Sequence, residues 1–475
     1  MIEPFTSATE LARLIRTREV SAVEAAEHYL SRVDEVNPAV NAIVWMDRAD
    51  VMRRAEASDA RIRAGHDVRP FEGVPIPIKD LTAVRGQPCT YSSLSADETP
   101  AEENEVTVDI IEAAGFVLFG RSNSPEFGPL TVSENARHGK TRNPWNLEYT
   151  SGGSSGGASA AVAADMAPIA HASDGGGSIR VPSAATGLVG LKPSRGRVPN
   201  DVRGWEHSTT EGAIARTVQD AAAILDVLGV PDRLGWYSAP AAERPYLEEI
   251  RREGPRLRIG LLVDAPTGVE VDTECIDAAM AAARALESLG HRVEPVSPFL
   301  FSKEASEGFA DLVINASLWA VATGDIERVD PYIRYRYDRA ALFHAGEYAA
   351  LAGRLQWETR RVVAQWGEDF DVLLTPTTAC QTPPVGLVYD EANQTPAGPR
   401  LTELRTISFT AFCNVAGLPA ISLPVHTGTN GMPLGAQLVG GPFDESTLLR
   451  LAAELEPIFG WSERHATVTT SSESV

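Results

Sequence analysis

Two glycine-rich clusters on either side of a short apolar segment restrict the fold of this chain more than any other feature. They are Ser151–Ala158 and Asp174–Arg180. Glycine is costly to order, so such clusters need a reason. Gly/Ser runs often form flexible linkers, but the apolar residues 160–170 predict a buried Ala-rich helix between the clusters. We therefore expect backbone that approaches a substrate closely and points several N–H groups at one atom.

Helix and strand patterns alternate along the chain. Helix-capping residues are Ser21, Thr217, Asp272 and Asp444. Thr217 and Asp220 resemble a second capping box, and the helix after Ser21 is expected to stop before Pro38. Apolar runs predict strands at 74–79, 116–119, 257–263, 372–374 and 421–423. This pattern predicts an α/β protein with one mixed, mostly parallel sheet sandwiched between helices.

The organisation of the chain is expected to be simple. We find no long linker, so a single domain is predicted over residues 1–465, followed by a flexible tail over 466–475. The start of the chain lacks the pattern of a signal peptide, and no stretch of about 20 residues is continuously apolar. A cytoplasmic location is therefore predicted. A homodimer is the expectation on general grounds, because dimers are the commonest oligomers.

Charge and cysteine content exclude several kinds of partner. Lys and Arg number 42 against 64 Asp and Glu, a net charge of −22. This balance argues against nucleic acid or an anionic membrane as the main partner. The four cysteines are far apart and form no C-x-x-C motif, which argues against a disulfide framework and a zinc ribbon.

Serines in the first cluster suggest hydrolysis, and three catalytic systems can be compared. Residues 152–156 match the nucleophile elbow G-x-S-x-G, which needs an apolar strand directly before it, but residues 145–150 are poor strand core. A Ser-His-Asp triad needs a histidine, and the nearest, His171, is more typical of a half-buried structural residue. Metal hydrolysis lacks H-E-x-x-H and any carboxylate cluster at ligand spacing.

The third system uses lysine as the base. Lys79 ends a short predicted strand in which Val74, Ile76 and Ile78 alternate with prolines. A lysine takes a hydroxyl proton only when neutral, and burial can lower its pKa by several units from about 10.4. Seen alone, Lys79 would more often be a surface lysine paired with Asp80.

These residues carry a resemblance to the amidase signature family. The string GGSSGG at 152–157 and the pattern D-x-G-x-S-I-R-x-P from Asp174 to Pro182 resemble the signature of that family. The spacings also agree, because 75 residues separate Lys79 from Ser154 and 24 separate Ser154 from Ser178. Further similar segments are 141–146 and 190–193, and the similarity spans roughly residues 7–461.

The resemblance implies a Ser–cisSer–Lys triad. Ser178 would be the nucleophile, Ser154 would bridge from a cis peptide bond, and Lys79 would be the base and acid. The backbone N–H groups of Gly175, Gly176, Gly177 and Ser178 would form the oxyanion hole. Ser155 and Asp174 would hold the two loops by hydrogen bonds, with Arg180 as a structural partner for a carboxylate. The resemblance implies no metal and no organic cofactor.

Within the family, the chain resembles the branch of 6-aminohexanoate-cyclic-dimer hydrolases and acylamidases. The similar segments are Lys79–Thr82, Ala113–Leu118, Thr141–Asn146 and Thr410–Ala420. The main rival is the glutaminase-like subunit of the tRNA-dependent amidotransferase. The sequence segments typical of that subunit are absent after Ser178 and at residues 211–216. A degenerate binding protein would have lost a triad member, and none is missing.

The resemblance constrains the substrate less, because it weakens over 231–371, where pocket walls lie in this family. By family position, Gly128, Pro129 and Leu130 would form one wall, and Asn315 would contact a substrate amide. A charged substrate would need an arginine clamp, and no arginine stands out for that role. We therefore expect an apolar or aromatic amide or a lactam as the small-molecule substrate. Cleavage of carbamates or esters by the same site is the alternative.

Overall fold

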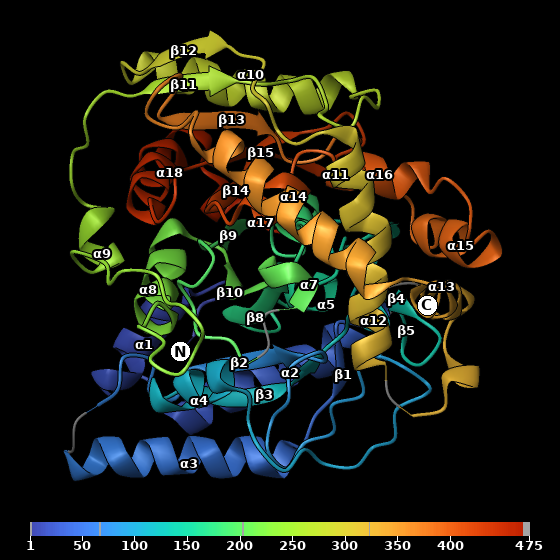
Figure 1. Ribbon diagram of the computed structural model, residues 1–475. Helices are drawn as coiled ribbons and strands as arrows, with labels where there is room; N and C mark the ends of the chain where they lie inside the picture. Colours follow the sequence, from blue (N-terminus) through green and yellow to red (C-terminus); the bar gives the residue numbers. More distant parts are fainter. Residues whose placement is uncertain (1, 66–67, 202–203, 323, 469–475) are drawn as a thin grey trace.

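Two β-sheets that meet edge to edge form the centre of the molecule. The computed structural model describes residues 2–65, 68–201, 204–322 and 324–468. An eight-stranded sheet has the order β12-β11-β13-β15-β14-β9-β10-β8, and a three-stranded sheet has the order β1-β3-β2. Strand β2 packs against β8. In Figure 1 the strand labels follow this order from β12 at the top to β8, with β2 and β3 below.

The strands of the large sheet, in spatial order, are β12 (Arg292–Pro295), β11 (Arg258–Leu261), β13 (Val372–Pro376), β15 (Pro433–Val439), β14 (Ala420–Thr427), β9 (Val189–Lys192), β10 (Thr210–Ala215) and β8 (Ile169–Asp174). The strands of the small sheet are β1 (Ile43–Trp45), β3 (Val117–Ser122) and β2 (Pro75–Lys79). Two short antiparallel pairs are β4 (Glu134–Asn135) with β5 (Gly139–Lys140), and β6 (Arg142–Asn143) with β7 (Asn146–Thr150).

The prediction of an α/β fold with a mixed sheet is confirmed, but the sheet is less parallel than predicted. Only the pairs of β11 with β12 and with β13 are parallel among the described strands of the large sheet. The other five pairs are antiparallel. One reason is local, because β14 and β15 are joined by a tight turn over 428–432, which forces an antiparallel hairpin.

Helices cover both faces of the large sheet, as predicted. Packed against one face are α8 (Val218–Leu228), α10 (Thr273–Ser288) and α18 (Glu445–Phe459). Against the other lie α5 (Gly156–Ala163), α6 (Arg180–Thr186) and α17 (Ala411–Ala416). The core alternates accordingly: Val372 and Leu374 of β13 belong to the first cluster, whereas Leu373 belongs to the second.

The remaining helices precede, follow or connect these layers. They are α1 (Ala8–Arg16), α2 (Ala22–Val40), α3 (Arg48–Ala64), α4 (Val106–Ala113), α7 (Gly204–His207), α9 (Tyr246–Glu249), α11 (Lys303–Gly308), α12 (Ile314–Val321), α13 (Pro331–Ala340), α14 (Ala345–Val363), α15 (Leu387–Gln394) and α16 (Leu401–Ile407), with a π-helix η1 (Phe309–Val313) and the short turns η2 (Ile326–Arg328) and η3 (Trp461–Glu463).

Most predicted helix boundaries and caps are found, with three differences. The capping box at Ser21 and the cap at Asp444 are confirmed. Helix α2 does not stop before Pro38 but runs one turn further, because Asn41 N–H donates to the carbonyl of Asn37 at 2.7 Å. The hydroxyl of Thr217 caps α8, whereas Asp272 precedes α10 without a side-chain cap bond.

The third difference concerns Asp220, which does not complete the second capping box. Its carboxylate instead accepts the N–H groups of Ala8 and Thr9 at the start of α1, at 2.9 and 2.8 Å. The sequence pattern for a box was therefore correct only for its Thr217 half.

The segment between the glycine clusters also differs from the prediction. Helix α5 already begins at Gly156, inside the first cluster, and ends at Ala163. Residues 169–174 form strand β8 and not the end of a helix. The segment before the first cluster forms strand β7, which pairs with β6, forms an isolated bridge to Pro384 through Tyr149 and is only partly buried. The expected tail falls mainly at 469–475, outside the described residues.

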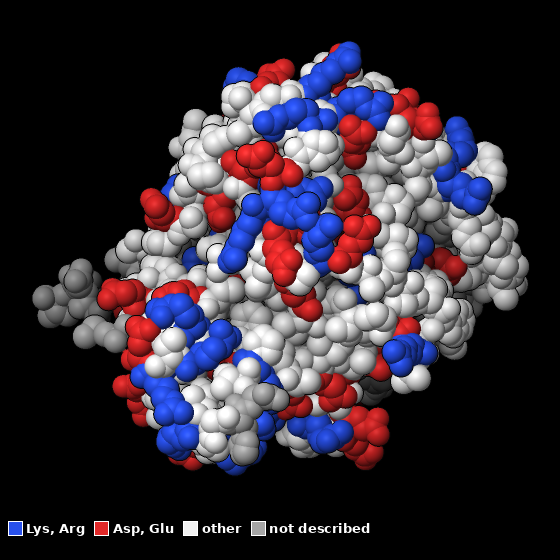
Figure 2. Space-filling view, turned by 90° about the vertical axis from the view of Figure 1, so that its left-hand side faces the viewer, with Lys and Arg blue, Asp and Glu red and all other residues white. Residues whose placement is uncertain are grey.

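The surface carries charges of both signs. Figure 2 shows Lys and Arg side chains interspersed with Asp and Glu on one face, with no single-sign field across it. In the described part of the chain, no helix has the length and apolar character needed to cross a membrane. The four cysteines are unpaired, and three of them are buried.

Candidate active site

Lys79 ends strand β2 at the seam between the two sheets. The side chain is fully buried, and its nitrogen Nζ lies within hydrogen-bond distance of three serine hydroxyls. These hydroxyls belong to Ser154 at 2.7 Å, Ser155 at 2.9 Å and Ser173 at 3.1 Å. The sequence brings Lys79 here because its strand is apolar on both faces. Ser173, on β8, is a contact that the sequence analysis missed.

The environment of Lys79 favours the neutral amine. Burial lowers the pKa of Lys79 to about 7, and the carboxylates of Glu211 and Asp174 only partly oppose this shift. Lys79 forms no ion pair within the described residues. The surface interpretation is therefore wrong, because Asp80 is itself buried and pairs with Arg121.

The first glycine cluster forms a loop between β7 and α5 that carries Ser154. The peptide bond between Gly153 and Ser154 is cis, as the resemblance implied. A Cβ atom on Gly153 would lie 2.6 to 2.8 Å from the backbone of Val132, and one on Gly157 would lie 2.3 Å from the backbone nitrogen of Asn123. Glycine is needed at both positions because neighbouring backbone occupies the space of a side chain.

The second cluster turns from β8 into α6 around the side chain of Asp174. The Asp174 carboxylate accepts the N–H groups of Gly177 at 2.7 Å and Ile179 at 3.1 Å. Arg180 donates to both oxygens of the same carboxylate. Burial alone would raise the pKa of Asp174, but the Arg180 guanidinium and these hydrogen bonds hold it well below its usual value. The expected supporting roles of Asp174 and Arg180 have this geometric basis.

Ser155 joins the two loops. Its backbone N–H donates to the carbonyl of Ser178 at 3.2 Å, and its hydroxyl donates to the carbonyl of Ser173 at 3.1 Å. Ser178 itself lies at the start of the turn into α6 and is partly exposed. Its hydroxyl makes no hydrogen bond to any described residue. The structure thus brings Ser154, Ser155 and Lys79 into direct contact and attaches Ser178 to them through the backbone.

The N–H groups of the second cluster separate into two kinds. The N–H of Gly177 is already donated to Asp174, so it does not point freely outward as the sequence analysis expected. The N–H groups of Gly175, Gly176 and Ser178 have no acceptor among the described residues. Gly176 and Ser178 are also partly exposed. The two partly exposed donors, on Gly176 and Ser178, are accessible to a ligand.

Helix α17 and the residues before it hold the second cluster from outside. Asn414 donates to the Asp174 carbonyl at 2.9 Å and to its carboxylate at 2.8 Å, and accepts from Arg180. The hydroxyl of Thr410 donates to the Gly176 carbonyl at 2.6 Å. Both residues lie in the segment 410–420, which the sequence analysis noted as similar to the family without assigning a role.

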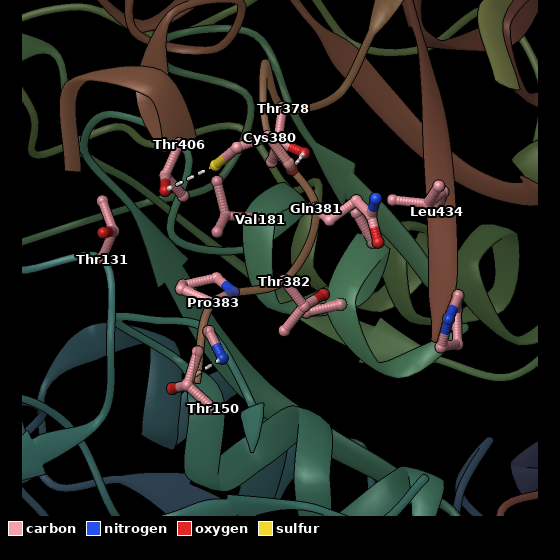
Figure 3. A pocket seen from close by; sticks show the side chains of 14 residues that line it. Thr131, Thr150, Val181, Thr378, Cys380, Gln381, Thr382, Pro383, Thr406 and Leu434 are labelled. Atoms are coloured by element: carbon pink, nitrogen blue, oxygen red, sulfur yellow. Dashed lines mark hydrogen bonds between the residues drawn. The ribbon is translucent and has the colours of Figure 1, made fainter. Parts of the chain in front are cut away.

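A cavity opens beside the two clusters (Figure 3). Gly152 and Val181, from the first cluster and from α6, form part of its wall. Thr378 and Cys380 of the loop after β13 and Thr406 of α16 also line it, and the Cys380 sulfur lies 3.7 Å from the Thr406 hydroxyl (Figure 3). Small side chains and hydroxyls therefore border this cavity.

The predicted substrate-binding residues lie in two places. Leu130 is buried in an apolar cluster with Phe127 and Tyr332, and the next residue, Thr131, reaches the cavity of Figure 3. Gly128, with a positive φ, and Pro129 complete that loop. Asn315 is buried and lines a different cavity. These four assignments stay predictions.

No group of three or more His, Cys, Asp and Glu side chains in the described residues is placed to hold a metal ion. The arrangement offers a lysine whose pKa burial lowers to about 7, hydroxyls within its reach and backbone N–H groups without an acceptor among the described residues. These parts define the class of hydrolases that activate a serine through a lysine.

Comparisons with known proteins support the same class. The sequence model of the Amidase family matches residues 24–449. A 6-aminohexanoate-cyclic-dimer hydrolase from Paenarthrobacter ureafaciens is 34% identical over 100% of this chain and 99% of the relative. An acylamidase from Rhodococcus erythropolis is 35% identical over 96% of each chain. A solved structure of 6-aminohexanoate cyclic dimer hydrolase superposes with a TM-score of 0.91, at 32% identity, over 98% of this chain and 100% of that one. The chain belongs to the amidase family and is a hydrolase of carbon–nitrogen bonds.

Proposed function

We propose that this chain hydrolyses small to medium, mostly apolar or aromatic amides or lactams through an acyl-enzyme on Ser178. The observation that carries the proposal is the contact of a buried, counterion-free Lys79 with Ser154, next to the loop of Ser178. The similarity to an acylamidase and to a cyclic-amide hydrolase supports the substrate class.

In the first half of the reaction, the Ser178 oxygen attacks the amide carbon. The Ser178 proton passes to Ser154, whose own proton passes to Lys79. The carbonyl oxygen becomes an oxyanion, which the N–H groups of Gly175, Gly176 and Ser178 are placed to receive. When the carbon–nitrogen bond breaks, Lys79 returns the proton through Ser154 to the leaving amine.

In the second half, water attacks the acyl-enzyme ester and releases the acid. The proton of the water moves along the same relay to Lys79 and then to the Ser178 oxygen as the ester bond breaks. The enzyme is restored, and the balance is one amide and one water giving one acid and one amine. No step requires a further co-reactant.

Hydrolysis of a small panel by purified protein tests the proposal. The panel is an anilide, a linear aliphatic amide, a lactam, a carbamate and glutamine, each assayed with the wild type and with Ser178→Ala. We expect Ser178→Ala to lose at least about 10³-fold in kcat. Its Tm should stay within a few degrees of wild type, because the hydroxyl of Ser178 has no partner among the described residues. Full activity of Ser178→Ala would overturn the assignment of the nucleophile.

The same panel separates the alternatives. Preferential cleavage of the carbamate would favour urethane hydrolysis by the same site, since only the leaving group differs. Cleavage of glutamine alone, or silence until partner subunits are added, would favour an amidotransferase subunit.

We further infer a single catalytic domain over residues 1–465, a cytoplasmic enzyme and a homodimer. Four unpaired cysteines support a reducing compartment. Light scattering of the purified protein would test the dimer directly.

A further inference from the structure

A second cavity lies outside the site described above. Residues of η1, α12 and α13 line it together with the segment 396–400. Polar side chains dominate its wall, and Arg336 and Arg400 both reach it. This composition differs from the cavity of Figure 3, which small side chains border.

Arg336 is a buried cation without a counterion. Its side chain is 4% exposed, and its guanidinium donates only to neutral acceptors, the Ala310 carbonyl at 3.1 Å and the Asn315 side-chain oxygen at 2.6 Å. The Nε atom has no acceptor, and Arg336 forms no ion pair within the described chain. A charge taken out of water without a partner is costly, so this arrangement calls for an anion.

The other charges around the cavity cancel in pairs. Asp311 also lines it, but its carboxylate is held by Arg339 at 3.0 and 2.5 Å. Arg400 pairs with Glu403. Among the described charged residues that line the cavity, Arg336 therefore has a positive charge that no carboxylate balances.

Tyr332 gives the cavity a rigid aromatic wall between the two arginines. The guanidinium carbons of Arg336 and Arg400 lie 4.7 and 4.9 Å from the centre of its ring. Arg400 also donates to the Tyr332 hydroxyl at 2.5 Å. Stacking of this kind fixes a planar guanidinium fork, which is the geometry that binds a carboxylate in a bidentate manner.

The cavity shares walls with the surroundings of the proposed active site. Tyr332 packs in one apolar cluster with Phe127 and Leu130, and Thr131 lies in the wall of the first cavity. Helix α16 begins directly after Arg400, and its residue Thr406 lines the first cavity. A helix of this length spans about 10 Å. The two cavities therefore border opposite ends of helix α16.

We propose that Arg336 binds the carboxylate of a small organic acid in this cavity. The carboxylate belongs either to the far end of an amide substrate or its product, or to a separate small molecule. The first of these two sources rests on the proposed function. The sequence alone gave no sign of such a clamp, because Arg336 becomes distinctive only through its burial and its missing counterion.

Two substrate series test the proposal. One series holds monoanilides of straight-chain dicarboxylic acids of increasing length, and the other holds alkyl anilides of matched length. For the best-fitting length, wild-type kcat/KM should be at least about tenfold higher for the acid than for the neutral anilide. Arg336→Gln, which keeps hydrogen-bonding groups toward Ala310 and Asn315, should reduce that preference by about tenfold, mainly through KM. Arg336→Lys should restore part of it.

A matched control is Arg334→Gln on the same helix, whose guanidinium pairs with Glu327 and Asp338. It should leave the preference unchanged. The Tm of each variant would show whether it folds, and Arg336→Lys keeps the test valid if Arg336→Gln does not.

Calorimetry with hexanoate on Ser178→Ala tests the site independently of turnover. Binding that Arg336→Gln weakens, together with competitive inhibition of the wild type, supports the substrate-end source. The same binding without competition supports a separate ligand. If no anilide is cleaved but hexanoate still binds through Arg336, the proposed function fails and this site stands. No acid preference at any length, together with no Arg336-dependent binding, overturns the proposal.

Discussion

Lys79 lies among three hydroxyl groups without a counterion, and this environment determines what the residue can do. Replacing it with Ala should reduce amide hydrolysis more than ester hydrolysis, because a departing amine needs a proton and an activated alkoxide or phenoxide does not. We expect kcat/KM for an anilide to fall by roughly 10³ and for an activated ester by about tenfold less. Steady-state kinetics of Lys79→Ala on both substrates would check this. Equal losses would contradict the acid role.

The pH dependence of the enzyme should follow the same residue. Burial lowers the pKa of Lys79 to about 7. A base acts when unprotonated, so kcat/KM should fall as pH drops below about 7 and level off above it. A pH–rate profile on a neutral anilide would measure this limb.

Replacing Glu211 should shift the acidic limb of the pH–rate profile. Its carboxylate raises the pKa of Lys79, opposing burial. Glu211→Gln keeps an acceptor for His171, which lies 3.0 Å from Glu211, but removes the charge. The acidic limb should therefore shift to lower pH, whereas the exposed Glu304→Gln should not move it. A shift to higher pH in Glu211→Gln would contradict the electrostatic account.

At the scale of elements, α17 is the support on which the second glycine cluster depends. Asn414 is buried and bonds to both Asp174 and Arg180. Asn414→Ala would leave these two buried charged groups short of partners and should lower the free energy of unfolding by about 3 kcal/mol. Urea denaturation would measure the loss. The exposed Asn146→Ala should change stability by less than about 0.5 kcal/mol, and a similar loss there would argue against this explanation.

The elements that could be predicted from the sequence are those with local signals. The box at Ser21 and the apolar alternation before Lys79 depend on neighbours in the chain, and both were predicted correctly. The pairing of β13 with β15 depends on residues about 60 positions apart, which no local pattern encodes. An alternation of helices and strands suggested parallel pairing, and the short turn between β14 and β15 overrode it.

The same distinction holds at the site. The motif residues were predicted because their types and spacings are unusual. Ser173 was missed because strand β8 was not predicted, so nothing placed this serine beside Lys79. The engagement of the Gly177 N–H by Asp174 was missed because it depends on the turn geometry, which the residue types do not specify.

At the scale of the whole molecule, the carboxylate of Asp220 ties the N-terminal layer to the large sheet. It lies on α8 and accepts three hydrogen bonds from Ala8 and Thr9 of α1. Asp220→Ala should lower stability by about 2 kcal/mol and expose the first 20 residues to protease. Limited proteolysis followed by mass spectrometry would locate the first cuts. Asp277→Ala, at an exposed position of helix α10 outside this contact, serves as the control. First cuts elsewhere would contradict the tether.

The contact between the two sheets determines how the activity of this protein responds when the fold begins to loosen. Lys79 arrives from the three-stranded sheet, and Ser173 arrives from the edge strand of the eight-stranded one. If either sheet loosens, water reaches the amine and its proton affinity returns toward that of an ordinary lysine. The rate of turnover at neutral pH therefore reports whether the two sheets are packed against each other. As the sheets loosen, this rate should decrease while circular dichroism still shows intact strands and helices.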